Sequence, residues 1–165
     1  MSTTTGAGLE GVIAGESEIC YIDGFAGVLS YRGYNIHTLA EHASFEEVVY
    51  LLWNGRLPKA NELEALKAEL AANRAIPQPV LDFLGSVPKA VPMDVLRTAV
   101  SMLSLYDPLA RDNSAEANLA KAKKLVAQTP TIVTAFDRLR NGKPVLAADP
   151  SLSLAGNFLD RKSVV

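Results

Sequence analysis

Two histidines are the residues of this chain best suited to acid–base or metal chemistry. His37 and His42 are five positions apart, which places them on different faces of a helix, where residues three or four apart share a face. The chain has one cysteine and no third histidine to complete a zinc site. We therefore interpret both histidines as polar residues at the start of a helix.

Two adjacent carboxylates and a single thiol are the next candidates. Glu46 and Glu47 are neighbours, so their side chains point in different directions, which disfavours a pair that shares a proton. Glu47 follows Ser44 by three residues, the spacing of a capping box, and we assign it to helix capping. Cys20 is the only cysteine, which excludes a disulfide within the chain. We expect it to be a small buried residue of a strand.

The early glycines satisfy the letters of a dinucleotide-binding motif. Gly6, Gly8 and Gly11 have the GxGxxG spacing, but that motif binds a pyrophosphate only where it follows a strand and opens a helix. Five residues precede Gly6, too few for that strand, and no βαβ pattern follows. We interpret the three glycines as turn residues.

Two groups of charged residues remain: Lys121, Lys123 and Lys124, and Asp107, Arg111 and Asp112. The lysines fit the solvated face of an amphipathic helix. The second group fits a charged loop without a recognisable pattern. The residues by themselves therefore predict no catalytic, cofactor-binding or metal-binding position.

The composition is that of a soluble globular protein with one domain. The chain has 165 residues, of which 48% are hydrophobic and 21% charged, with a net charge of −2. This balance gives no electrostatic reason to expect a nucleic acid or a membrane as partner, and no apolar run approaches the roughly 20 residues that span a bilayer. The first eight residues, MSTTTGAG, resemble neither a signal peptide nor a transit peptide. We expect a cytoplasmic protein.

The first 33 residues predict a small antiparallel sheet. Short segments rich in Val, Ile, Leu and Tyr occupy Val12–Ala14, Glu18–Ile22 and Gly27–Tyr31. Asp23-Gly24 lies between the last two and predicts a hairpin turn.

About five helices are predicted after residue 35. Ser44 and Glu47 open the first, which Pro58 stops, and Asn61 with Glu64 forms a second box. A short helix follows around Pro79–Leu84.

The next two helices begin at Pro92, which fits a first helical position, and at Ser114. Asp107-Pro108 closes the former. Pro130 is expected to kink or split the latter, which Asn141-Gly142 ends. The fold class is therefore all-α with a short β start.

Apolar residues at helical spacing define the faces of these two helices. The expected inward residues are Leu96, Ala99, Val100 and Leu103 in the first helix, and Leu119, Ala122, Val126, Ile132, Val133, Phe136 and Leu139 in the second. Further apolar residues lie outside these stripes: Val95, Met102, Leu125 and Ala135. A helix that is apolar on more than one face must bury both.

Several stretches in a fixed order resemble the N-terminal half of citrate synthase and 2-methylcitrate synthase. They are residues 8–15 (GLEGVIAG), 19–23 (ICYID), 29–36 (LSYRGYNI), 39–41 (LAE), 44–48 (SFEEV), 50–58 (YLLWNGRLP), 92–98 (PMDVLRT), 130–133 (PTIV) and 157–159 (NFL). The resemblance covers residues 8–159. One departure is Val91, where the family often has histidine.

The resemblance implies a multi-helical fragment of the citrate synthase large domain. The parent would be an acyltransferase of the tricarboxylic acid cycle that condenses acetyl-CoA, its substrate, with oxaloacetate. The family's two catalytic histidines, its catalytic aspartate and its carboxylate-binding arginines follow the position of Leu159. We therefore assign no catalytic, cofactor-binding or metal-binding residue here and expect the chain alone to be inactive.

The resemblance also implies a homodimer that forms through helices near residues 92–105 and 121–140. Two alternatives stay open: a fragment of 2-methylcitrate synthase, and a non-catalytic helical interaction module. Residues 160–165 (DRKSVV) do not fit the family, and one reading frame of a common sequencing adapter translates as this hexapeptide followed by a stop. We expect them to form a non-family tail that is loosely attached.

Overall fold

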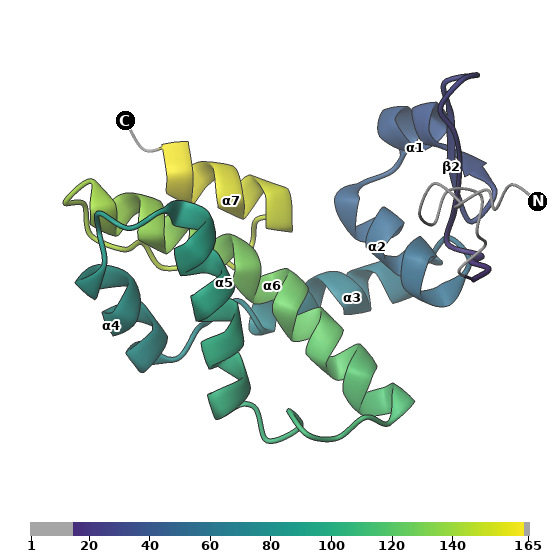
Figure 1. Cartoon of the computed structure of the whole chain (residues 1–165). Helices are drawn as coiled ribbons and strands as arrows, with labels where there is room; N and C mark the ends of the chain where they lie inside the picture. Colours follow the sequence, from purple (N-terminus) through teal and green to yellow (C-terminus); the bar gives the residue numbers. More distant parts are fainter. Residues whose placement is uncertain (1–14, 164–165) are drawn as a thin grey trace, which may run out of the picture. The chain divides into compact units, whose positions relative to one another are not determined.

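The computed structural model describes residues 15–163 (Figure 1), with no side-chain description for Ser163. Two compact units divide the chain: an N-terminal unit that ends at Leu57 and a C-terminal unit that begins at Pro58. Within the described residues, a three-stranded sheet precedes seven α-helices. The predicted all-α fold with a short β start is confirmed, although the number of helices is larger than expected.

The N-terminal unit opens with an antiparallel sheet of strands β1 (Cys20–Asp23), β2 (Val28–Tyr31) and β3 (Tyr34–Asn35), in the order β1-β2-β3. The first turn lies where the sequence predicts it, but the glycine with a positive φ, +67°, is Gly27 rather than Gly24. The carboxylate of Asp23 holds this loop by accepting the backbone N–H groups of residues 25 and 26, at 3.0 and 2.9 Å. The predicted strand at residues 12–14 lies outside the described residues.

A second tight turn joins β2 to β3 within the stretch 29–36 that resembles the family. Tyr31 pairs with Tyr34, and the two residues between them, Arg32 and Gly33, have φ values of +48° and +84°. Two positive φ values in a two-residue loop are the signature of a type I′ turn, whose twist matches that of the flanking strands. The Arg32 guanidinium then reaches the backbone oxygen of Leu52, at 3.2 Å.

Two helices complete the N-terminal unit, α1 (Ile36–His42) and α2 (Phe45–Asn54). The predicted capping box is confirmed: Glu47 N–H donates to Ser44 Oγ at 3.3 Å, and the Glu47 carboxylate accepts Ser44 N–H at 2.7 Å. Gly55, with a φ of +75°, ends α2 in a left-handed conformation. The expectation that Pro58 stops this helix is therefore wrong, because a glycine cap ends it first.

Five α-helices form the C-terminal unit: α3 (Ala60–Ala72), α4 (Gln78–Ser86), α5 (Pro92–Leu103), α6 (Ala115–Arg140) and α7 (Leu154–Ser163), with a short 3₁₀ helix, η1 (Ser104–Tyr106), after α5. The capping box predicted at Asn61 and Glu64 is wrong, because the observed box lies two positions earlier, at Lys59 and Glu62. Glu62 instead accepts the backbone N–H of Lys59 at 2.7 Å. The predicted starts at Pro92 and Ser114 are confirmed.

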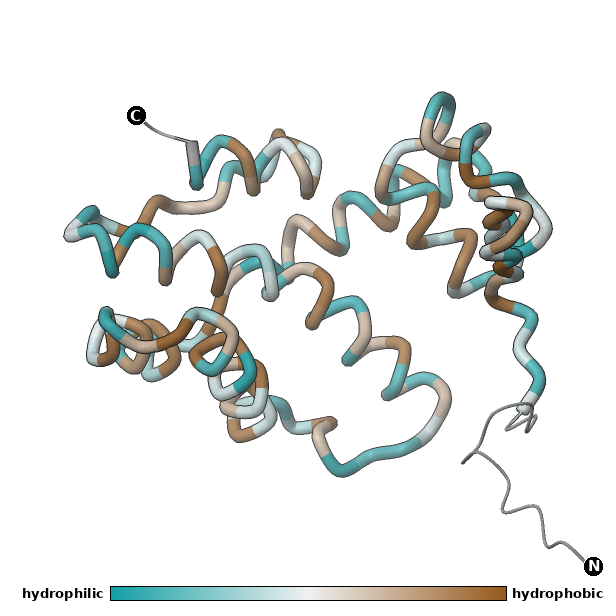
Figure 2. The backbone as a smooth tube through the Cα atoms, turned by 45° about the horizontal axis from the view of Figure 1, so that its top comes forward, coloured by the Kyte–Doolittle hydropathy of each residue, from teal (hydrophilic) through white to brown (hydrophobic). Residues whose placement is uncertain are grey.

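Helix α6 is the central element of the C-terminal unit, since α3, α4, α5 and α7 all pack against it (Figure 1). It continues through Pro130 without a break. Of the two predicted effects of Pro130, the split is wrong, because packing on both sides of α6 outweighs the roughly 3 kcal/mol that an internal proline costs, and the kink stays a prediction. Figure 2 shows hydrophobic turns alternating with hydrophilic turns along this helix.

The core joins α4, α5 and α6 through Val80, Leu84, Val95, Ala99, Leu103, Ile132, Ala135 and Phe136. Val95 and Ala135, which the sequence placed outside the inward stripes, are 3% and 1% exposed. Leu119, expected inward, is 39% exposed. The error has a physical cause: α6 is covered from two sides, so its buried face is wider than a single stripe and is rotated from the predicted one.

The last described residues do not behave as a loose tail. Helix α7 continues through Ser163, and Arg161 is 3% exposed. The guanidinium of Arg161 donates to Thr131 Oγ1 at 3.0 Å. The expected loose attachment is therefore wrong for residues 160–163, because a buried acceptor satisfies part of the arginine; residues 164 and 165 lie outside the described residues. Whether the hexapeptide is foreign to the family stays a prediction.

Candidate functional site

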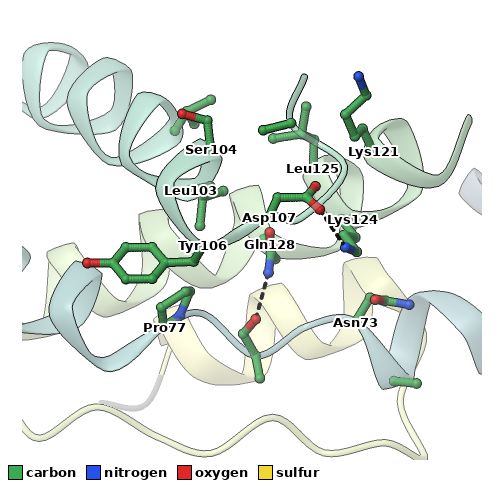
Figure 3. Close-up of a pocket in the computed structure, with 14 residues that line it drawn as sticks. Asn73, Pro77, Leu103, Ser104, Tyr106, Asp107, Lys121, Lys124, Leu125 and Gln128 are labelled. Atoms are coloured by element: carbon green, nitrogen blue, oxygen red, sulfur yellow. Dashed lines mark hydrogen bonds and ion pairs between the residues drawn. The ribbon is translucent and has the colours of Figure 1, made fainter. Parts of the chain in front are cut away.

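A pocket of about 310 Å³ lies in the C-terminal unit, bounded by the end of α3, the end of α5 with η1, and the first half of α6 (Figure 3). Its polar centre is an ion pair between Asp107 and Lys124. The Lys124 ammonium lies 3.0 Å from Asp107 Oδ1, which also accepts the backbone N–H of Leu109 at 3.0 Å. The Leu109 N–H is the main cause of a lowered pKa at Asp107; burial opposes it, and Lys124 and Lys121 add to the lowering. Asp107 is therefore an ionised, partnered carboxylate at neutral pH.

The lysines of α6 are not a solvated face, which corrects the sequence interpretation. Lys121 donates to the backbone oxygen of Asp112, Lys123 pairs with Glu69 of α3 at 2.7 Å, and Lys124 pairs with Asp107. Lys121 and Lys124 thus hold the loop between η1 and α6, and Lys123 holds α3, against α6. The sequence contains no signal for these partners, because they are 9, 54 and 17 positions away.

The charged loop after η1 also has a defined role. Asp112 Oδ1 accepts the backbone N–H of Ser114 at 2.8 Å, and Ser114 in turn caps α6. This hydrogen bond is the main cause of a lowered pKa at Asp112. Arg111 is exposed. The loop therefore sets the start of α6.

The remaining polar groups of the pocket are also engaged or turned away. Gln128 donates to the backbone oxygen of Ala75 at 2.8 Å, and the phenol of Tyr106 points away from the Asp107–Lys124 pair (Figure 3). Histidine and cysteine are absent from the lining. A general base works best when its pKa lies near the operating pH, whereas the pKa of Asp107 is lowered by its hydrogen bond from Leu109 N–H and by Lys124. The arrangement positions helices rather than performing acid–base chemistry.

The two histidines lie in α1, and both are exposed. His37 is at the start of this helix as interpreted, whereas His42 is its last residue, so the interpretation is wrong for His42. His42 Nε2 lies 3.6 Å from the carboxylate of Glu41 at the surface. Across residues 15–163, the structure brings together no group of three histidine, cysteine, aspartate or glutamate side chains that could hold a metal.

The remaining candidates from the sequence are the single cysteine, a glutamate of α2 and the early glycines. Cys20 is exposed, so the expectation of a buried strand residue is wrong. Glu46, which has no assigned role in the sequence, is 3% exposed. The glycines at positions 6, 8 and 11 lie outside the described residues.

Two buried arginines were missed by sequence reasoning. Arg74 donates to the backbone oxygens of Asp149 and Leu152, both at 2.7 Å, and its own backbone oxygen accepts Thr131 Oγ1–H at 2.8 Å. Arg138 donates to the backbone oxygen of Pro144. Both arginines hold the segment that leads from α6 to α7. Their acceptors are main-chain atoms of an irregular loop, which no residue type in the sequence reveals.

None of the described helices combines the length and the apolar character that crossing a membrane requires.

Comparisons with known proteins agree over nearly the whole chain. A family model described as "Citrate synthase, C-terminal domain" matches residues 8–163. The citrate synthases of Haloferax volcanii and Deinococcus radiodurans are 45% and 44% identical, over 96% and 92% of this chain. A 2-methylcitrate synthase of Mycobacterium tuberculosis is 40% identical over 92%. The chain spans 43%, 41% and 38% of the lengths of these relatives.

Solved structures give the same result. The citrate synthase of Pyrobaculum aerophilum matches with a TM-score of 0.88 at 34% identity, over 94% of this chain and 41% of its own. That of Thermotoga maritima matches with a TM-score of 0.83 at 36% identity, over 95% of this chain and 41% of its own. The family model, the sequence identities and the fold agree, and the chain belongs to the citrate synthase family.

Proposed function

We propose that this chain is the N-terminal part of an enzyme that condenses acetyl-CoA with oxaloacetate to give citrate and CoA. The observation that carries the proposal is the agreement with citrate synthases over 96% of the chain in sequence and 94% in structure. A further structural neighbour, 25% identical with a TM-score of 0.86, is the citrate synthase of Thermoplasma acidophilum in a ternary complex with carboxymethyl coenzyme A and oxaloacetate.

The chemistry of this reaction places its catalytic groups elsewhere in the full-length protein. The methyl group of acetyl-CoA is a very weak acid, so its proton is removed only if a base and a hydrogen-bond donor to the enolate oxygen converge on it. The family resemblance assigns these roles to an aspartate and two histidines that follow position 159. Among the described residues, the pocket at Asp107 offers none of these roles, and His37 and His42 are exposed. The 165-residue chain alone is therefore inactive.

Release of free CoA from acetyl-CoA in the presence of oxaloacetate tests the proposal. The purified chain should give no release above a blank. A chimera that joins residues 1–159 to the part of the Haloferax volcanii relative that follows its matched region should release CoA. Turnover by the 165-residue chain that disappears in His37→Ala or His42→Ala would contradict both the inactivity and the surface role of these histidines.

A specific observation keeps propionyl-CoA as a second acyl donor. The matches include 2-methylcitrate synthase at 40% identity and a citrate/2-methylcitrate synthase of Bacillus subtilis at 37%. The full-length protein from the same gene can be assayed with acetyl-CoA and propionyl-CoA in competition. The ratio of the two kcat/KM values then identifies the preferred acyl donor.

Two further proposals concern assembly and location. Exposed apolar side chains lie along the expected pairing helices: Leu105 is 75% exposed, and Leu119 and Leu125 are each 39% exposed. They support a homodimer formed through helices near residues 92–105 and 121–140. The single thiol, exposed on Cys20, fits the reducing cytoplasm.

A further inference from the structure

The backbone of Arg32, in the turn between β2 and β3, has a conformation that its residue type does not favour. Among residues 15–163, Arg32 is the one residue other than glycine with a positive φ, +48°. Side chains other than that of asparagine rarely adopt this region, and those that do are held there by surrounding contacts. Asparagine is the residue that a type I′ turn prefers before glycine. Local turn chemistry therefore does not explain an arginine at this position.

The end of helix α2 supplies a reason. Leu51 O accepts the backbone N–H of Gly55 at 2.8 Å, whereas the next carbonyl, that of Leu52, is among those that a helix end leaves without an intrahelical donor. Arg32 Nη2 donates to Leu52 O at 3.2 Å. A cation at the carboxyl end of a helix also interacts favourably with the helix dipole. The guanidinium of Arg32 therefore caps α2 from a different element of the N-terminal unit.

Arg32 also contacts the residues that lead into β1. Its backbone N–H donates to Ile19 O at 2.9 Å, and its Nη1 lies 3.4 Å from the carboxylate of Glu18. The Glu18 side chain is 94% exposed, so this ion pair contributes little. The Arg32 side chain is only 22% exposed, and within the described part of the chain its buried Nε has no hydrogen-bond partner. Burying this guanidinium is therefore costly, and its contact with Leu52 is the interaction that offsets the cost.

We propose that Arg32 couples the three-stranded sheet to α2, so that the two open together. The strands have four, four and two residues, and a sheet this small needs packing against a helix to be stable. Separation of the turn from α2 leaves the Leu52 carbonyl without its donor and so destabilises both elements at once. The left-handed backbone of Arg32 is retained because it places the side chain at the end of α2.

The substitution Arg32→Asn separates this role from the role of the turn. Asparagine suits the turn at least as well as arginine, but it is too short to replace the guanidinium. Trp53 is the only tryptophan of the chain and lies in α2 next to Leu52, so its fluorescence reports on α2. Hydrogen–deuterium exchange of residues 28–35, read by mass spectrometry, reports on β2 and β3. Both signals are followed in urea, with Glu18→Gln as the matched control.

In the unaltered 165-residue chain and in Glu18→Gln, the two signals should change over the same range of urea concentration. In Arg32→Asn without urea, exchange at residues 28–35 should be faster by at least roughly tenfold, the effect of losing a hydrogen bond to a charged group. The sheet should then open at a lower urea concentration than α2. If Trp53 is already unfolded in Arg32→Asn, trimethylamine N-oxide restores the unit, and α2 should refold at a lower concentration of this osmolyte than the sheet.

Three results would overturn the inference. Exchange in Arg32→Asn that is unchanged or slower would show that residue 32 serves the turn alone. Sheet and α2 signals that still change together in Arg32→Asn would show that other contacts couple them. An equal effect of Glu18→Gln would assign the coupling to the exposed ion pair.

Discussion

The guanidinium of Arg161 donates to Thr131 Oγ1 at 3.0 Å in a region where two other guanidiniums, those of Arg74 and Arg138, are also buried. Burial is the main cause of a lowered pKa at Arg161, and the charges of Arg74 and Arg138 lower it further. Its Nε atom has no hydrogen-bond partner. Arg161 is therefore a poorly compensated buried charge.

Replacing Arg161 by an apolar side chain should stabilise the chain. Arg161→Met should raise the free energy of unfolding by about 1–4 kcal/mol, the range seen when buried charges give way to packed apolar groups. Thr131 Oγ1 keeps its bond to the backbone oxygen of Arg74. Urea unfolding followed by circular dichroism measures the change. Arg74→Met is the control with the opposite sign, because it removes the Arg74 hydrogen bonds to the backbone oxygens of Leu152 and Asp149, of which the second keeps the side-chain N–H of Asn157 as a donor. A loss of stability in Arg161→Met would show that the hydrogen bonds of Arg161 compensate for the burial of its charge.

The Asp107–Lys124 pair should make stability depend on pH. The folded pKa of Asp107 lies below the ordinary value of 3.8, so the unfolded chain binds the proton more readily. The contribution to stability is therefore present above pH 3.8 and lost as the pH falls through the folded pKa. Asp107→Asn should lower the free energy of unfolding by about 1 kcal/mol at pH 7 and by much less in strong acid. Urea unfolding at a series of pH values measures this difference.

A surface ion pair provides the control for this effect. Asp94 and Arg97 lie 3.1 Å apart, with Asp94 60% exposed, and such pairs contribute little. Asp94→Asn should therefore leave stability nearly unchanged at each pH. If Asp94→Asn and Asp107→Asn lower the free energy of unfolding equally, the Asp107–Lys124 pair is not the source of the pH dependence.

The type I′ turn at Arg32-Gly33 should be sensitive to a methyl group. Gly33 has a φ of +84°, and an alanine there costs about 1–2 kcal/mol because its Cβ approaches the following carbonyl. Gly24 does not share this left-handed conformation, and a Cβ on it meets nothing within 4 Å. Gly33→Ala should therefore lower the denaturation midpoint while Gly24→Ala leaves it in place. Equal effects would refute the turn assignment.

Association should depend on the exposed face of α6. Leu125→Asp should weaken self-association and preserve the far-ultraviolet circular dichroism spectrum, because Leu125 is 39% exposed. Ala135→Asp should unfold the chain, since Ala135 is 1% exposed. Sedimentation velocity at several concentrations measures the first effect. A dispersed monomer at every concentration, without binding of a hydrophobic dye, would contradict the dimer.

Local chemistry predicted the starts of three helices, α2, α5 and α6, whereas tertiary packing determined which helix faces are buried. The Ser44–Glu47 box, Pro92 and Ser114 are visible in sequence because the residues that form a cap are neighbours. The buried face of α6 was misplaced because it depends on which helices cover it. The partner of Lys123 is 54 positions away, so no local pattern indicates it.

The same limit applies to the candidate site. Sequence alone gave His37 and His42 no catalytic role and placed both at the start of a helix, which is correct for His37 and wrong for His42. The sequence did not indicate the ion pair between Asp107 and Lys124, because the conformation of the loop between them determines whether the two side chains come into contact. The family resemblance carried the functional interpretation, since the residues described here contain too little chemistry to carry it alone.

The lysine contacts of α6 give its two halves different sensitivities to the solvent. Lys121, Lys123 and Lys124 hold the first half to its neighbours through charged groups, whereas Ile132, Ala135 and Phe136 hold the second half through apolar packing. Added salt screens the former and leaves the latter intact. Amide hydrogens in the first half should therefore exchange with deuterium faster as salt is raised, through local opening, while those of the second half exchange only when the whole unit unfolds.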